Sequence, residues 1–208
     1  MTRSAPGLYG LEKMAARTKG DFLYLPCAMS YEEIALELDT LADYFGIPRV
    51  DHGERIRACE KALEKAHALI GDTPVAIDYL GIPRPLGLAR LLLDHGFHVK
   101  RVYLDAVSPE EEEVFHDLQE RYPDLLLSAT VHVSLRLCHG KEKDTLAIGP
   151  KAAWFTGTDH FVNVVELNGM WGYDALIRLC AMMEDSFLHA GDPRDVLPRK
   201  GFGCASCI

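Results

Sequence analysis

The sequence lacks any stretch that could enter or cross a membrane. No run approaches the roughly 18 consecutive apolar residues that a transmembrane helix needs. The first residues, MTRSAPGLYGLEK, contain no apolar core of the kind that a signal peptide requires. Internal repeats and low-complexity tracts are absent as well. We therefore expect a cytoplasmic, globular protein with no membrane partner.

Positive charge is also scarce. The chain has 22 lysines and arginines against 31 aspartates and glutamates, which gives a formal net charge of -9. Such a chain is repelled by phosphate backbones, so we expect no nucleic-acid partner. Many of the acidic residues gather in the segment 109–124, which is typical of the exposed face of a surface helix.

The common nucleotide and nucleophile motifs are missing too. No G-x-G-x-x-G follows a predicted strand, and G-x-x-x-x-G-K-[ST] occurs nowhere in the chain. Dinucleotide and P-loop nucleotide binding therefore lack their usual phosphate cradles. The G-x-S-x-G elbow of the α/β hydrolases is absent as well. The sequence leaves the catalytic residues unknown.

What the sequence does contain begins with helical patterns over residues 1–72. A short strand is predicted at 22–25, and Ser30 with Glu33 forms a capping box that starts a helix. This helix carries an apolar stripe over Ile34–Phe45, and a second helix is predicted over 51–70. We interpret residues 1–72 as a helical arm with one short strand, the remainder of a preceding α/β domain.

From Pro74 onward, short apolar runs alternate with amphipathic segments, which is typical of parallel βαβ units. Right-handed crossovers fold such units into an α/β, doubly wound, mostly parallel sheet of the Rossmann or flavodoxin type. We expect this domain over residues 73–192 and a C-terminal tail over 193–208. The predicted strands are 75–80, 98–104, 125–129, 145–148 and 152–155, and the predicted helices are 86–95, one starting at 108–111, and 171–190.

The six cysteines divide by their spacing. Cys59 and Cys180 lie in apolar stripes at helical spacing, which favours burial in the core. Cys204 and Cys207 form a C-x-x-C pair that suits one edge of a zinc or iron-sulfur site. Two further ligands would have to come from elsewhere, and the alternative is a redox-active or incidental dithiol.

Two loops predicted at the carboxyl edge of the sheet contain candidate binding residues. Arg84 lies between two prolines after the first strand, where it can bind an anionic cofactor group, unless it is an ordinary surface arginine. His160 lies in the polar loop 156–163, where it can bind a cofactor or serve as a hydrogen-bonded structural residue. Because loops after parallel strands converge, we expect Arg84 and His160 to face the same cleft.

Five segments occur in an informative order along the chain. They are Arg3-Ser4 before a helical stretch, Tyr24-Leu25-Pro26 with the helix ending at Gly46, Pro74–Val99 with its G-x-x-R-P loop (Gly81, Arg84, Pro85), Asp144–Gly149 followed by Lys151, and Gly169–Asp174 before the last helix. Together they resemble the C-terminal portion of a nitrogenase component 1 type oxidoreductase subunit, that is, of a molybdenum-iron protein-like chain.

The sequence departs from this family at several points. The cluster-binding cysteines of the family lie in an N-terminal domain that has no counterpart here, and its cofactor cysteine falls at about Met1. The position of the family's cofactor histidine falls at 164–166, which contains no histidine, and His160 is the nearest candidate. A complete metallocluster site therefore cannot be assembled from this sequence alone.

The resemblance implies a short or truncated component that takes part in electron transfer to an iron-sulfur cluster, a related metallocluster or a tetrapyrrole at an interdomain cleft. In this interpretation Gly81 lets the backbone approach the cofactor and Arg84 hydrogen-bonds it. The implied partners are an ATP-dependent iron-protein reductase and a second component 1 type subunit, which would supply or share the cofactor. The alternatives are a non-enzymatic metallocofactor or tetrapyrrole binding module and an inactive fragment.

The helical arm carries more apolar surface than it is predicted to bury by itself. If the stripes over 34–45 and 56–70 belong to a domain that is not present, they remain uncovered. We therefore expect the chain to associate with itself or with a partner, as an oligomer.

Overall fold

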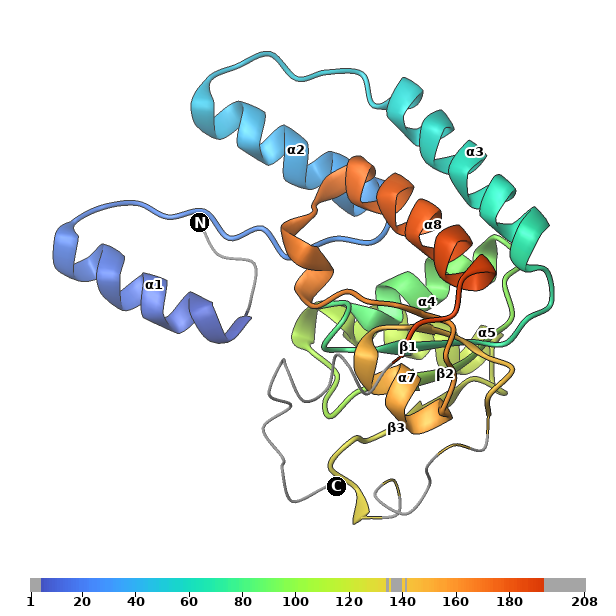
Figure 1. Cartoon of the computed structure of the whole chain (residues 1–208). Coiled ribbons are helices and arrows are strands. Elements are labelled where there is room, and N and C mark those ends of the chain that lie inside the picture. The colour runs from blue at the N-terminus through green and yellow to red at the C-terminus, as the bar shows by residue number, and fades with distance from the viewer. Residues whose placement is uncertain (1–4, 134, 136–139, 141, 193–208) are drawn as a thin grey trace.

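A computed structural model of the chain, which describes residues 5–133, 135, 140 and 142–192, shows a five-stranded, fully parallel sheet covered by helices (Figure 1). The strand order is β3-β2-β1-β4-β5. The predicted α/β, doubly wound, parallel fold is confirmed, with the reversal of winding between β1 and β4. The strands are β1 (Val75–Asp78), β2 (Val99–Tyr103), β3 (Leu126–Ser128), β4 (Leu146–Ile148) and β5 (Phe161–Val162).

Helices lie on both faces of the sheet. One face is covered by α4 (Pro85–Asp94), α5 (Glu112–Arg121) and α8 (Gly172–Leu188). The buried apolar side chains of these helices pack with Val75 and Ile77 of β1 in the main core. The other face is covered by α7 (Pro150–Thr156), which packs against Ala76 and Ala147. Because both faces are covered, all residues of β1 and β4 are buried, as expected for central parallel strands. Two short 3-10 helices, η1 (Pro109–Glu111) and η2 (Glu166–Gly169), lie in the connections.

The N-terminal region forms α1 (Ala5–Thr18), α2 (Tyr31–Phe45) and α3 (Gly53–Ile70). The predicted cap of α2 is confirmed, because the Ser30 hydroxyl accepts a hydrogen bond from the Glu33 amide. Gly46 ends the helix in the left-handed conformation at φ 65°.

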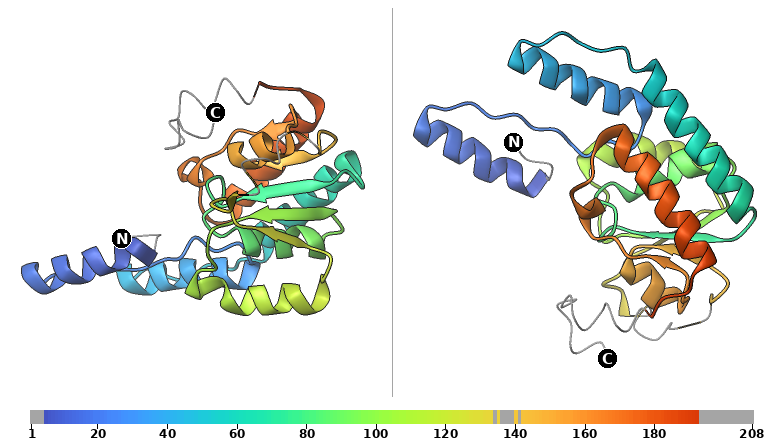
Figure 2. Two further views of the ribbon diagram at one scale, coloured as in Figure 1. Left: turned by 90° about the horizontal axis from the view of Figure 1, so that it is seen from below. Right: turned by 45° about the horizontal axis from the view of Figure 1, so that its top comes forward.

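The apolar stripe of α3 is not left uncovered, which corrects the expectation for residues 56–70. Its buried residues belong to the same core as the sheet, and α3 runs along α8 (Figure 2). The sequence does not reveal this pairing because α3 and α8 are separated by about half of the chain. The buried residues on the stripe are Cys59, Leu63, Ala66 and Ile70.

Two strand predictions are wrong. Residues 152–155 lie in α7. Pro150 occupies the first helical position, and Ala152 and Ala153 favour a helix over a strand. The last strand is Phe161–Val162 instead. Residues 22–25 form no strand, and only Tyr24 makes an isolated bridge. None of the described helices is both long and apolar enough to span a lipid bilayer.

Candidate functional site

Four strand ends bring polar side chains together at the carboxyl edge of the sheet. Tyr79 follows β1, Asp105 comes shortly after β2, Thr130 comes shortly after β3, and Lys151 lies in the first turn of α7 after β4. Ligands in doubly wound sheets bind at this edge, near the point where the winding reverses. We call these four residues the carboxyl-edge cluster.

The members of the cluster are joined by hydrogen bonds. Lys151 Nζ donates to the Tyr79 hydroxyl at 2.6 Å and to Thr130 Oγ1 at 3.4 Å. The Thr130 hydroxyl donates to Asp105 Oδ1 at 2.7 Å, and Asp105 also accepts from the Val131 amide at 3.1 Å. The Lys151 ammonium lies 4.4 Å from the centre of the Tyr79 ring. An ammonium has three N–H donors, and the described residues accept from two of those of Lys151, so one donor remains for a ligand.

The charge of Asp105 is stabilised within this cluster. Burial alone would raise the pKa of this carboxyl, but hydrogen bonds from Thr130, Tyr79 and the Val131 amide, together with the charge of Lys151, lower it below its usual value. Asp105 is therefore a carboxylate at neutral pH and fixes the orientation of its neighbours. The cluster can bind an anionic or hydroxylated ligand through Lys151.

A buried carboxylate occupies the helix N-terminus next to the cluster. Asp78, which is fully buried at the end of β1, accepts hydrogen bonds from the amides of Ala152 at 2.7 Å and Gly81 at 2.8 Å. Glu111 accepts in the same way from the amide of Gly87 in the first turn of α4 at 2.9 Å. These amides are the donors that phosphates use at helix N-termini, so the chain's own carboxylates take the place of such a ligand.

Gly81 permits a close contact within the chain itself. A Cβ atom on Gly81 would lie 2.8 Å from the Gly149 Cα and 3.2 Å from the Val164 carbonyl oxygen. The loop after β1 therefore packs directly on the loop after β4. The predicted approach of a cofactor to Gly81 stays a prediction.

Arg84 links the N-terminal region to the sheet. Its side chain is buried, with 4% of the residue exposed, and Nη2 donates to Glu33 Oε1 at 2.8 Å and to the Glu110 carbonyl at 2.7 Å. Glu33 belongs to α2 and Glu110 to η1. Among the described residues, Nε has no hydrogen-bond partner. Contact between Arg84 and a cofactor stays a prediction, and it would require Arg84 to exchange or share these partners.

His160 lies at the opposite edge of the sheet, so the prediction that it shares a cleft with Arg84 is wrong. It directly precedes β5, and its Nδ1 donates to the Ser186 carbonyl at 2.9 Å. The error follows from the strand predicted at 152–155. Because those residues form α7, the loop after them leads into the next strand at the amino edge, not out of one at the carboxyl edge.

The described residues offer no metal site. Among them, no group of three or more His, Cys, Asp or Glu side chains is arranged to hold a metal ion. Burial raises the pKa of the Cys59 thiol to about 11 and that of Cys180 to about 12. Both are therefore protonated at neutral pH, whereas metals bind the thiolate. The predicted metal ligands Cys204 and Cys207 lie outside the described residues.

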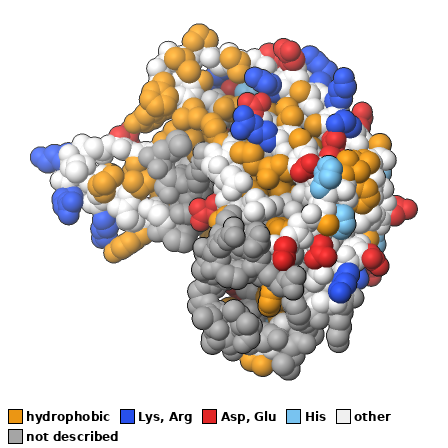
Figure 3. Space-filling model, in the orientation of Figure 1, with side chains coloured by type: hydrophobic (Ala, Val, Ile, Leu, Met, Phe, Trp, Pro, Cys, Tyr) orange, Lys and Arg blue, Asp and Glu red, His pale blue; other side chains and the backbone are white. Residues whose placement is uncertain are grey.

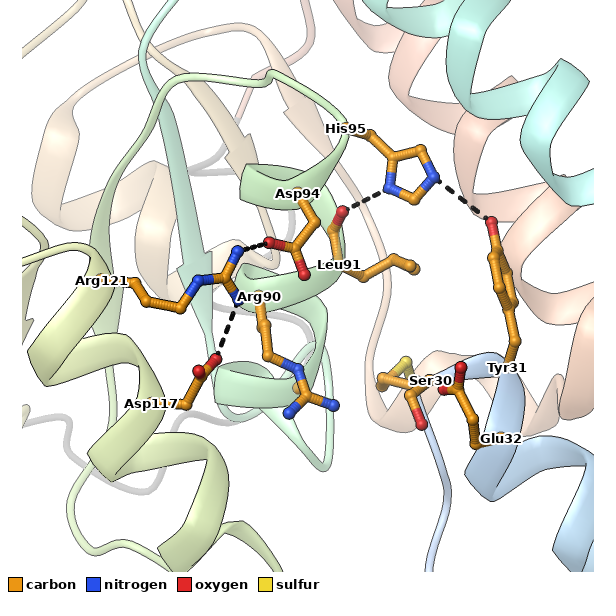
Figure 4. A pocket seen from close by; sticks show the side chains of 11 residues that line it. Ser30, Tyr31, Glu32, Arg90, Leu91, Asp94, His95, Asp117 and Arg121 are labelled. Atoms are coloured by element: carbon orange, nitrogen blue, oxygen red, sulfur yellow. Dashed lines mark hydrogen bonds and ion pairs between the residues drawn. The ribbon is translucent and has the colours of Figure 1, made fainter.

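A groove of about 370 Å³ opens between the start of α2 and the helices α4 and α5 (Figure 4). Arg121 bridges Asp94 and Asp117 on one wall, and Arg90 makes no ion pair with a described residue. The lining holds three carboxylates and two guanidinium groups, so the groove has no net positive charge that would attract an anion. The charged lining residues are Glu32, Arg90, Asp94, Asp117 and Arg121.

A buried glutamate near Arg84 makes the stability of the fold depend on pH. Glu37 is 5% exposed and accepts a hydrogen bond from the Trp171 indole at 2.7 Å, but its Oε1 has no partner among the described residues. Burial raises the pKa of Glu37 to about 7, although hydrogen bonds from Trp171 and the Ala28 amide and the charge of Arg84 oppose this.

Because its pKa is raised on folding, Glu37 binds a proton more tightly in the folded chain than in the unfolded one. Its contribution to stability is therefore fully present below about pH 4.5 and is lost as the pH rises through about 7. Glu37→Gln should remove this dependence and gain on the order of 2 kcal/mol relative to the parent at pH 8.

Urea unfolding of both proteins from pH 5 to pH 8 measures the effect, and Glu32→Gln, on the exposed side of the same helix, is the matched control. An identical pH slope for Glu37→Gln and the parent would show that Glu37 does not titrate in this range.

Comparison with known proteins identifies a similar fold. A solved structure of nitrogenase Cp1 at pH 6.5 superposes with a TM-score of 0.55 at 13% sequence identity. The superposition covers 86% of this chain and 42% of that chain, so the chain spans less than half the length of its structural neighbour. At this identity the likeness shows a nitrogenase-like fold. No protein-family model matches the chain, and no curated protein matches it in sequence.

Proposed function

We propose that this chain is a subunit of a nitrogenase component 1 type oxidoreductase and takes part in electron transfer only within a larger complex. In this proposal the carboxyl-edge cluster binds the anionic part of the cofactor, and a partner chain supplies the metal ligands. The observation that supports the proposal is the fold, since 86% of this chain follows a nitrogenase chain over only 42% of that chain's length.

The described residues do not fit a metallocluster bound by this chain alone. Their arrangement provides no group of three potential metal ligands, and two of the described cysteines are held as thiols. We therefore assign no reaction step to a cluster held by these residues. A second component 1 type subunit would complete the cleft, and an ATP-dependent iron-protein reductase would deliver the electrons.

The carboxyl-edge cluster does fit an anionic group such as the carboxylate of a tetrapyrrole. Lys151 offers a positive charge and one remaining N–H donor. Tyr79 fixes the position of the ammonium by a hydrogen bond to its hydroxyl and a cation–π contact with its ring. Asp105 orients Thr130 and balances the local charge. The bound cofactor would supply the redox chemistry, while these residues bind it and fix its position.

Lys151→Met should weaken the binding of such a ligand about tenfold or more, because a charge-assisted hydrogen bond is lost while most of the apolar side chain is kept. Titration of the full chain with protoporphyrin IX, which carries propionate carboxylates, measures this by absorption and fluorescence. The matched control is Lys143→Met, which removes an exposed lysine from the connection before β4. Equal weakening in both variants would indicate general charge attraction and would remove the support for a site at the cluster.

A further inference from the structure

The helix α1 projects from the body of the molecule and makes no extended packing contact with another described helix or strand (Figures 1 and 2). It has 14 residues, including Gly7 and Gly10 in its interior. A helix of this length is marginal in water even with favourable residues, and each interior glycine weakens it further. A surface outside the described body must therefore stabilise α1.

The sequence of α1 shows what kind of surface this is. Leu8, Leu11 and Ala15 recur at helical spacing and, with Met14, form an apolar stripe, while Lys13 and Arg17 lie on the other side. The first 20 residues of the chain contain four basic residues and one acidic residue, although the whole chain has a net charge of -9. The segment that contains α1 is therefore basic, and the rest of the molecule is acidic.

A matching apolar surface lies at the far end of α2 and the connection after it, which we call the α2 tip. In Figure 3, apolar side chains gather over this end and again on α1. The acids Glu32, Asp39 and Asp43 lie along α2, and Arg49 pairs with the last two, which leaves a net negative charge. The α2 tip consists of Tyr44, Phe45, Ile47 and Val50, all of them exposed.

We infer that two copies of this chain exchange their N-terminal helices, with α1 of each copy lying on the α2 tip of the other. The inference stands independently of the proposed cofactor role. The basic residues of α1 complement the acidic body of a second copy, whereas that same body is repelled from an anionic membrane surface. A reciprocal exchange covers both apolar surfaces at once and closes as a two-fold dimer.

The connection between the two helices permits this exchange. Residues from Leu25 to Met29 are anchored in the body, with Leu25, Cys27, Ala28 and Met29 buried. Residues 19–24 then set the direction of α1 and span roughly 20 Å when extended. The helix α1 can therefore reach a neighbouring molecule without disturbing the core.

Sedimentation velocity and light scattering of the full chain test the inference. We expect a dimer at tens of micromolar that weakens with added salt. Met14→Glu on α1 and Phe45→Glu on the α2 tip should each weaken the dimer about tenfold or more, because each buries an unpaired charge. The matched control is Leu188→Glu at the end of α8, which changes an equally apolar residue that is 59% exposed and lies away from both surfaces.

Cross-linking distinguishes exchange from contact within one chain. In an equimolar mixture of isotope-labelled and unlabelled chains, carbodiimide should join the Lys13 or Lys19 amine to a carboxylate of the other copy in peptides of mixed isotope composition. A monomeric chain, a dimer that resists both substitutions, or cross-links confined to chains of one isotope would each overturn the inference. Binding of the monomer to vesicles containing phosphatidylserine through α1 would overturn it as well.

Discussion

Arg84→Ala should lower the free energy of unfolding by about 2–4 kcal/mol, because a buried side chain loses its packing and two charge-assisted hydrogen bonds, while its partner Glu33 stays partly exposed to water. The Glu33 carboxylate and the Glu110 carbonyl both accept a hydrogen bond from Arg84 Nη2, and both lose this donor in the variant. The missing side chain also leaves a cavity between α2 and the start of α4. Urea unfolding at neutral pH measures the change.

Arg90→Ala is the matched control for this prediction. Arg90 lies in α4, which Arg84 directly precedes, is only partly buried, and makes no ion pair with a described residue. Its removal should change the free energy of unfolding by no more than about 0.5 kcal/mol. An Arg84→Ala variant as stable as the control but unable to bind protoporphyrin IX would instead identify Arg84 as a cofactor contact, as the family resemblance implies.

Gly149→Ala should be comparably severe, with a loss of about 3–5 kcal/mol. Gly149 has φ 103° and ψ 152°, a region that is open essentially to glycine alone. A Cβ atom at this position would also lie 2.4 Å from Asp78 Oδ2, inside the contacts that hold the carboxyl-edge loops together. Either the Asp78 carboxylate or the loop after β4 must move.

Gly46→Ala separates the two causes, since Gly46 also has a positive φ of 65° but nothing lies within 4 Å of an added Cβ atom. It should cost about 1 kcal/mol, from backbone strain alone. Thermal or urea unfolding of both variants gives the comparison. Equal losses in the two variants would mean that the loop after β4 adapts and that its packing on Asp78 is not tight.

Local signals in the sequence predicted the local parts of the structure. Ser30 and Gly46 define the ends of α2 through contacts within a few residues, and the alternation after Pro74 indicates a parallel, doubly wound sheet. The error at 152–155 has a local cause as well, because a short apolar run has no period that separates a buried strand from a buried helix. The pairing of α3 with α8 depends on contacts between distant segments.

The sequence predicts that a binding site lies at the carboxyl edge of the sheet, but it does not predict which residues form it. The loops after Leu80, Leu104 and Ala129 do lie at the carboxyl edge, as the rule for parallel sheets predicts. No local sequence motif marks Tyr79, Asp105 or Thr130 as a binding residue. They lie near Lys151 only because of the order of the strands in the sheet. Arg84 has a distinctive sequence setting, but its burial depends on Glu33, which lies 51 positions earlier.

In the proposed function, this chain contributes a binding edge to a cofactor whose metal ligands come from a partner. Anaerobic purification of the full chain, alone and together with a component 1 type subunit, followed by iron, sulfide and tetrapyrrole analysis and an absorption spectrum, tests it most directly. We expect no stoichiometric cofactor in the chain alone and a stoichiometric cofactor in the complex. A complete cluster in the isolated chain, or no cofactor in either preparation, would contradict it.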